Sequence, residues 1–209
     1  MKTIPSILAT ALAIGSAQAA VVVTDNGATV PTIGANDTGF IGTPDNRFGW
    51  DIETFTQTFS VPNTGTIDAI YLGYNAFDNG DTITITLSVN GNVVQSGLVL
   101  NGNNFSGTAA TDNNFGQFYW MKFDLSSENV PVTAGSNSFT MAATANTGTS
   151  WALAPTYKLG GDLYKGGALS LSGVAAGSDL RFAVTVVPEP SIAMLSGLGL
   201  FGLLLRRRA

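Results

Sequence analysis

The chain has 209 residues and a formal net charge of −5, and it contains neither cysteine nor histidine. Without cysteine no disulfide can form, and without histidine the commonest metal ligand and general base is missing. Of its 9 basic and 14 acidic residues, 5 and 13 lie between positions 20 and 187, which gives that stretch a charge of −8. An acidic body of this kind lacks the basic surface that binds nucleic acid. We therefore expect no nucleic-acid partner.

The first nineteen residues have the pattern of a secretory signal peptide. Lys2 supplies a positive charge, residues 4–14 are mostly apolar, and Ala17 and Ala19 form an Ala-x-Ala cleavage site. Such a segment engages the Sec machinery and is removed by signal peptidase. We predict a signal-peptide helix over residues 1–19 with cleavage after Ala19. The alternative is an ordinary N-terminal helix of the folded protein.

Residues 20–187 predict one all-β domain, because helical periodicity is nearly absent and alternation of apolar and polar residues is frequent. The alternation is clearest over residues 82–89, where isoleucine, leucine and valine occupy one face and threonine and serine the other. Residues 54–61, 119–125 and 180–186 repeat it, as expected of antiparallel strands with one buried face. Asn90-Gly91 predicts a type I′ turn that joins residues 82–89 to residues 93–100 in a hairpin.

Eight to ten such strands at regular spacing predict an antiparallel β-sandwich or jelly roll. Residues 101–114 are rich in asparagine, glycine, serine and threonine and predict a long surface loop. No linker divides the stretch, so we predict a single β-sandwich domain over residues 20–187.

One tight turn offers oxygen ligands to a calcium ion. Asp78, Asn79 and Asp81 place two carboxylates and an amide around Gly80. Ca²⁺ requires six to eight oxygen ligands, so other loops would have to complete the site. The alternative is an ordinary turn in which these side chains bond to the backbone. No other cofactor is expected.

Aromatic side chains near strand ends are candidates for stacking on sugar rings. Trp120 lies on a strand with aromatic residues on both faces, and we expect it to pack in the core. The candidates for glycan binding are Trp50, Trp151, Tyr157 and Tyr164.

The residues required for catalysis are scarce. Glycoside hydrolysis uses a pair of carboxyl groups, and the body has only two glutamates, Glu53 and Glu128. No nucleophile with a neighbouring base is visible. We expect no enzymatic activity, and we retain a glycan-active enzyme as an alternative.

The C-terminal segment combines a rigid motif, an apolar run and a basic cluster. Pro188, Glu189 and Pro190 form an extended Pro-Glu-Pro motif. Residues 192–205 carry no charge. As a helix they span roughly 21 Å, which is short for a bilayer core about 30 Å thick. Arg206, Arg207 and Arg208 are expected to stay on the cytoplasmic side and act as a membrane stop. We predict a short transmembrane helix here; the alternative is a buried C-terminal helix.

This combination resembles the PEP-CTERM sorting signal of Gram-negative bacteria, with the motif over residues 188–209. The resemblance implies processing by the membrane-embedded enzyme exosortase, after transient anchoring of the chain in the inner membrane. It also implies delivery to the cell surface or the exterior, together with exopolysaccharide of a biofilm matrix.

The body is similar to carbohydrate-binding-like jelly-roll domains that precede this sorting signal. The similarity lies in strand and turn signatures such as Gln57-Thr58-Phe59-Ser60-Val61-Pro62, Gly65-Thr66-Ile67, Asp81-Thr82-Ile83-Thr84 and Gly160-Gly161-Asp162-Leu163-Tyr164. It implies a non-enzymatic surface or matrix protein that binds exopolysaccharide weakly. A purely structural matrix or adhesion component without a specific ligand is the alternative.

Overall fold

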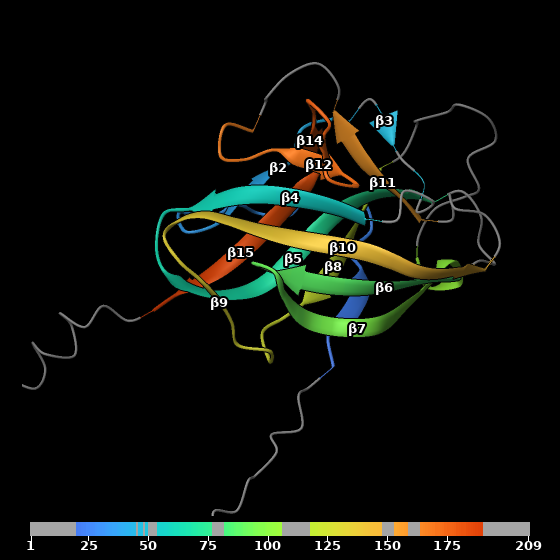
Figure 1. Ribbon diagram of the computed structural model, residues 1–209, viewed down its shortest axis with the longest axis horizontal. Helices are drawn as coiled ribbons and strands as arrows, with labels where there is room; N and C mark the ends of the chain where they lie inside the picture. Colours follow the sequence, from blue (N-terminus) through green and yellow to red (C-terminus); the bar gives the residue numbers. More distant parts are fainter. Residues whose placement is uncertain are drawn as a thin grey trace, which may run out of the picture.

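A computed structural model describes residues 20–44, 46–47, 49, 54–76, 82–105, 118–147, 153–158 and 164–189. In these ranges the chain forms two antiparallel β-sheets that pack face to face as a sandwich (Figure 1). The all-β prediction and the two-sheet architecture are confirmed. The predicted signal peptide and transmembrane helix lie outside the described residues. Within these ranges no helix is long and apolar enough to cross a membrane.

The larger sheet is built around the long strand β5, which pairs with β8, β9, β11 and β15. Its main path runs β1-β8-β5-β11-β14, while β2 pairs with β15 and β3 with β11. The strands are β1 (Val22–Asp25), β2 (Thr38–Phe40), β3 (Asn46–Arg47), β5 (Gly65–Ala76), β8 (Tyr119–Asp124), β9 (Val130–Val132), β11 (Leu153–Lys158), β14 (Asp179–Leu180) and β15 (Phe182–Pro188).

The smaller sheet has the order β13-β12-β4-β10-β6-β7. Its strands are β4 (Thr54–Val61), β6 (Thr82–Val89), β7 (Asn92–Asn101), β10 (Gly135–Thr147), β12 (Leu169–Leu171) and β13 (Val174–Ala175). The predicted hairpin is confirmed: β6 and β7 meet at Asn90 and Gly91, which have φ of 50° and 77°. The predicted loop after residue 100 opens instead with the end of β7 and a short 3₁₀ helix, η1 (Gly102–Asn104). The described ranges hold more strands than the eight to ten expected, since several have only two or three residues.

The core lies between the sheets, where residues of the longer strands point inward. Burial alternates strictly along β4 and β6, as the sequence pattern predicts. Phe139 of β10 contacts Phe59 of β4 with ring centroids 6.1 Å apart, and Phe182 of β15 at 5.7 Å. Each such fully buried ring contributes roughly 2–3 kcal/mol to folding. The phenylalanines therefore tie the two sheets to each other.

One inward position of β4 is polar. Gln57 is fully buried between Phe55 and Phe59. Its side-chain oxygen accepts a hydrogen bond from the backbone N–H of Leu180 at 3.1 Å, and its amide donates to the carbonyl of Thr58 at 2.9 Å. The N–H of Leu180 lies where β14 gives way to β15, so Gln57 satisfies a buried donor at this break.

Candidate functional site

The Pro-Glu-Pro motif begins inside the last strand of the larger sheet. β15 passes its terminal residues antiparallel along the start of β5 and ends at Pro188, which is paired with Gly65. The backbone N–H of Glu189 then donates to the carbonyl oxygen of Thr64 over 3.1 Å. Both motif side chains remain exposed to solvent. The predicted boundary between body and motif at residues 187 and 188 therefore falls within a strand, with no spacer between them.

Proline suits this edge position. It has no N–H to donate, so it is tolerated where a strand has an unpaired side or ends. β2 pairs with β15 only as far as Val184, and beyond that point β5 is the one strand of the described ranges that pairs with β15. In Figure 1 the end of β15 lies at one margin of the sandwich, beyond the stretch that β2 pairs with.

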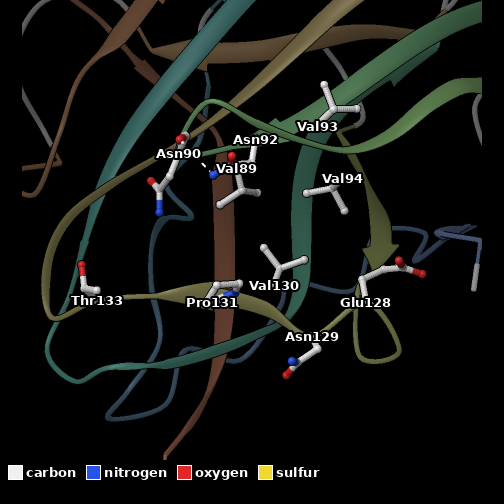
Figure 2. A pocket seen from close by; sticks show the side chains of 10 residues that line it. All are labelled: Val89, Asn90, Asn92, Val93, Val94, Glu128, Asn129, Val130, Pro131 and Thr133. Atoms are coloured by element: carbon white, nitrogen blue, oxygen red, sulfur yellow. Dashed lines mark hydrogen bonds between the residues drawn. The ribbon is translucent and has the colours of Figure 1, made fainter. Parts of the chain in front are cut away.

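A groove of about 360 Å³ lies near the same end of the sandwich, between the β6–β7 hairpin and the segment that leads into β9 (Figure 2). It is close to the motif because β9 and β15 flank the same stretch of β5: Thr66 pairs with Pro131 on one side and with Val187 on the other. The apolar lining residues are Val89, Val93, Val94, Val130 and Pro131, and the polar ones are Asn90, Asn92, Glu128, Asn129 and Thr133.

The polar groups of the groove differ in how they are bonded. Asn90 is occupied by the fold: its amide donates to Asn137 at 3.0 Å and its oxygen accepts from the N–H of Ser138 at 2.9 Å. Glu128 has one carboxylate oxygen that is buried and has no hydrogen-bond partner in the part of the chain that the structure describes. Apolar residues beside amide and carboxylate groups are the usual composition of a small-molecule site.

A buried arginine lies on the far face of the larger sheet, away from the core. Arg181 is 6 % exposed, and its guanidinium carbon lies 4.2 Å from the ring centre of Trp120, which is fully buried. The side chain passes over Gly73, where a Cβ would lie 2.8 Å from Cδ of Arg181 and from the hydroxyl of Thr156. Burial lowers the pKa of Arg181 to about 10, because the desolvated cation is disfavoured.

Among the described residues, several donors around Arg181 have no acceptor. They are Nε and Nη1 of Arg181, the indole Nε1 of Trp120 and the hydroxyl of Thr156, all of which are buried. The cation is stabilised instead by the indole ring, as cation–π contacts are in desolvated sites. The prediction that Trp120 packs inside the protein is confirmed, although its partner is a charge.

Of the four glycan candidates, the described residues include Tyr157 and Tyr164. The hydroxyl of Tyr164 bonds to Thr38 and accepts from the N–H of Ser60 at 2.9 Å, and its ring meets Phe182 edge-on at 5.2 Å. Tyr157 of β11 is half-buried and packs against the core cluster. Both rings thus pack between elements of the fold. The sequence did not indicate this packing role.

The other predicted site residues lie outside the described residues. They are Trp50 and Trp151, the calcium candidates Asp78, Asn79 and Asp81, the cleavage-site residues Ala17 and Ala19, and Pro190, Arg206, Arg207 and Arg208 of the tail. Among the described residues, no group of three or more acidic side chains could hold a metal ion.

Comparison with protein-family models gives a match over residues 186–208, to the PEP-CTERM protein-sorting motif. The chain carries a PEP-CTERM sorting motif. This motif implies processing by exosortase, and proteins that bear it are sorted to the cell surface or the exterior. No curated protein sequence matches the chain. Among solved structures, the chain is similar to a family 35 carbohydrate binding module from an environmental isolate, with 16 % identity and a TM-score of 0.34 over 81 % of this chain and 99 % of that one.

Proposed function

We propose that this chain is a secreted protein that exosortase processes and delivers to the surface or extracellular matrix of a Gram-negative bacterium. A signal peptide starts export, and the C-terminal helix anchors the precursor briefly in the inner membrane. The body is a non-enzymatic sandwich of the jelly-roll type that accompanies exopolysaccharide. The PEP-CTERM motif that emerges directly from β15 is the observation that carries this proposal.

The proposed ligand of the body is a glycan, bound weakly. The groove beside β9 supports this, because valine and proline side chains there offer an apolar surface to a sugar ring. Asn92 and Asn129 are exposed and add amide groups, which suit hydroxyl groups. Trp50 and Trp151 remain candidates for a stacking platform.

The sorting route is tested in cells that contain exosortase. Glu189→Ala should accumulate full-length precursor, because it removes the charge between the two prolines of the motif. Glu128→Ala is the matched control: it removes a glutamate at the same end of the sandwich and should leave processing unchanged. Processing is measured by mass spectrometry of the secreted protein. If Glu189→Ala is processed like the wild type, the proposal is contradicted.

Glycan binding is tested by isothermal titration of the processed protein with the producer's own exopolysaccharide. We expect heat from the wild type and a loss of heat from either Trp151→Ala or the pair Asn92→Ala with Asn129→Ala, according to which surface binds. Absence of heat from the wild type would favour the structural matrix component instead. A reducing-end assay on the same polysaccharide tests the enzymatic alternative, for which we expect no product.

A further inference from the structure

The first half of the sorting motif is held by the fold from several directions. Val186, where the matched segment begins, donates its N–H to Oδ1 of Asp37 at 2.9 Å. Glu189 donates to the carbonyl of Thr64, and the hydroxyl of Thr64 in turn accepts from the N–H of Ala134 at 3.2 Å. Thr64, which accepts the hydrogen bond from Glu189, is thus held in place by the turn between β9 and β10.

Glycine at position 65 permits the close approach of the motif to β5. A Cβ on Gly65 would overlap the carbonyl oxygen of Val187 and would lie 2.9 Å from Val186 and 3.0 Å from Cα of Pro188. Contacts this short force the backbone to shift, because they involve main-chain atoms that cannot rotate away. Any side chain at position 65 would therefore push the end of β15 off the sheet.

An enzyme that binds the motif as an extended segment would need backbone groups that the fold already binds. Peptide-binding clefts commonly take their ligands as extended segments, through main-chain hydrogen bonds. The N–H of Glu189 is engaged by Thr64, so it cannot also donate to an enzyme. Pro188 has no N–H at all, which leaves the enzyme few other groups to use here.

We propose that Thr64 and Gly65 are positioning residues for the sorting reaction: they hold Pro188 and Glu189 in the sheet, and exosortase receives the motif only when the end of β15 detaches. This inference rests on the proposed processing by exosortase. Strand ends open far more often than whole domains unfold. The folded body therefore stays intact while its last residues are released, and the frequency of release limits the processing rate.

A reversible cross-link tests the proposal on the full-length chain. Thr66 and Val187 are direct partners in the antiparallel register. Their Cβ atoms are expected about 4.5–5.5 Å apart, which is close enough for a disulfide after small adjustment. The chain has no native cysteine, so Thr66→Cys with Val187→Cys gives one defined pair. In cells that contain exosortase, we expect the oxidised variant to be processed at least tenfold more slowly, and to recover when a reductant is added.

A second cysteine pair is the matched control. Thr56→Cys with Thr140→Cys places the same cross-link in the smaller sheet, where the two native hydroxyls lie 2.9 Å apart. This variant should be processed like the wild type in both redox states. Gly65→Ala tests the opposite direction: it should detach the strand end, speed processing about threefold and accelerate hydrogen exchange at the N–H of Glu189.

Processing of the oxidised Thr66–Val187 pair at the wild-type rate would overturn the proposal, and so would slower processing of Gly65→Ala. The Glu189→Ala variant distinguishes failure of the positioning proposal from failure of the proposed processing by exosortase. If Glu189→Ala blocks processing while the cross-linked chain is processed normally, only the positioning role is wrong. If both are processed normally, exosortase does not act on this motif.

Discussion

Replacing Arg181 by methionine tests whether the buried guanidinium is a net cost to the fold. Burial lowers the pKa of Arg181 to about 10. At roughly 1.4 kcal/mol per pKa unit, a lowering of this size corresponds to about 3 kcal/mol against the charged form. The contact with Trp120 offsets about 2 kcal/mol of that cost. Methionine keeps a sulfur contact with the indole ring and carries no charge.

We therefore expect Arg181→Met to change the free energy of unfolding by between zero and about 2 kcal/mol in the stabilising direction, as buried charges replaced by apolar residues commonly do. For a domain of this size, that corresponds to a rise in Tm of up to about 6 °C. The assay is thermal and urea unfolding of the processed protein, with Lys165→Met as the control at an exposed position. The control should stay within about 0.5 kcal/mol of the wild type.

The pH dependence gives a second measurement. The folded-state pKa of Arg181 lies below the unfolded value, so from about pH 10 up to the unfolded pKa the unfolded chain binds more protons. In that window the wild type should gain stability relative to the methionine variant as pH rises. A loss of more than about 2 kcal/mol in Arg181→Met at neutral pH would refute the reasoning, because it would show that the guanidinium has an acceptor that stabilises it.

Three further substitutions follow from the contacts described. Tyr164→Phe removes the hydroxyl that bonds to Ser60, and should cost about 1–3 kcal/mol in urea unfolding; no change would mean that the hydroxyl is not bonded. Gly167→Ala places a Cβ against the backbone of Thr58 and should cost about 1–3 kcal/mol, seen as a lower Tm; an unchanged Tm would contradict the tight contact. Asp124 has its pKa lowered to about 2, so its contribution is present above about pH 4 and is lost as pH falls through 2. Since this side chain is 34 % exposed and solvent screens its charge, Asp124→Asn should cost less than about 1 kcal/mol at pH 7 and nothing near pH 2, measured by urea unfolding at both pH values.

The long strands could be predicted from the sequence because one of their faces is buried and the other is not. Period-two alternation identified residues 54–61 and 82–89, which are β4 and β6 with unchanged limits. The turn at Asn90 and Gly91 was predictable because asparagine and glycine tolerate positive φ. Strands of two or three residues, such as β3, β13 and β14, are too short to show any period.

The buried polar positions could not be predicted, since each depends on partners far away in the chain. Gln57 interrupts an apolar face and gave no signal that it would accept from Leu180, 123 residues later. Arg181 follows an aspartate and a leucine in what resembles an ordinary strand, and only the register places it over Gly73 and beside Trp120. The sorting motif is the opposite case: the motif could be recognised from the sequence, but its pairing with β5 could not be predicted.

The absence of a spacer between β15 and the motif would also fix the orientation of the sandwich relative to any molecule to which the processed protein is attached. A chain cut just after Glu189 would end at a residue whose backbone N–H is bonded to Thr64, directly before β5. If that new carboxyl terminus is joined to a surface molecule, the sandwich has no flexible tether and cannot rotate freely. The groove beside β9 would then lie near the point of attachment, and the opposite end of the sandwich would be presented to the surroundings.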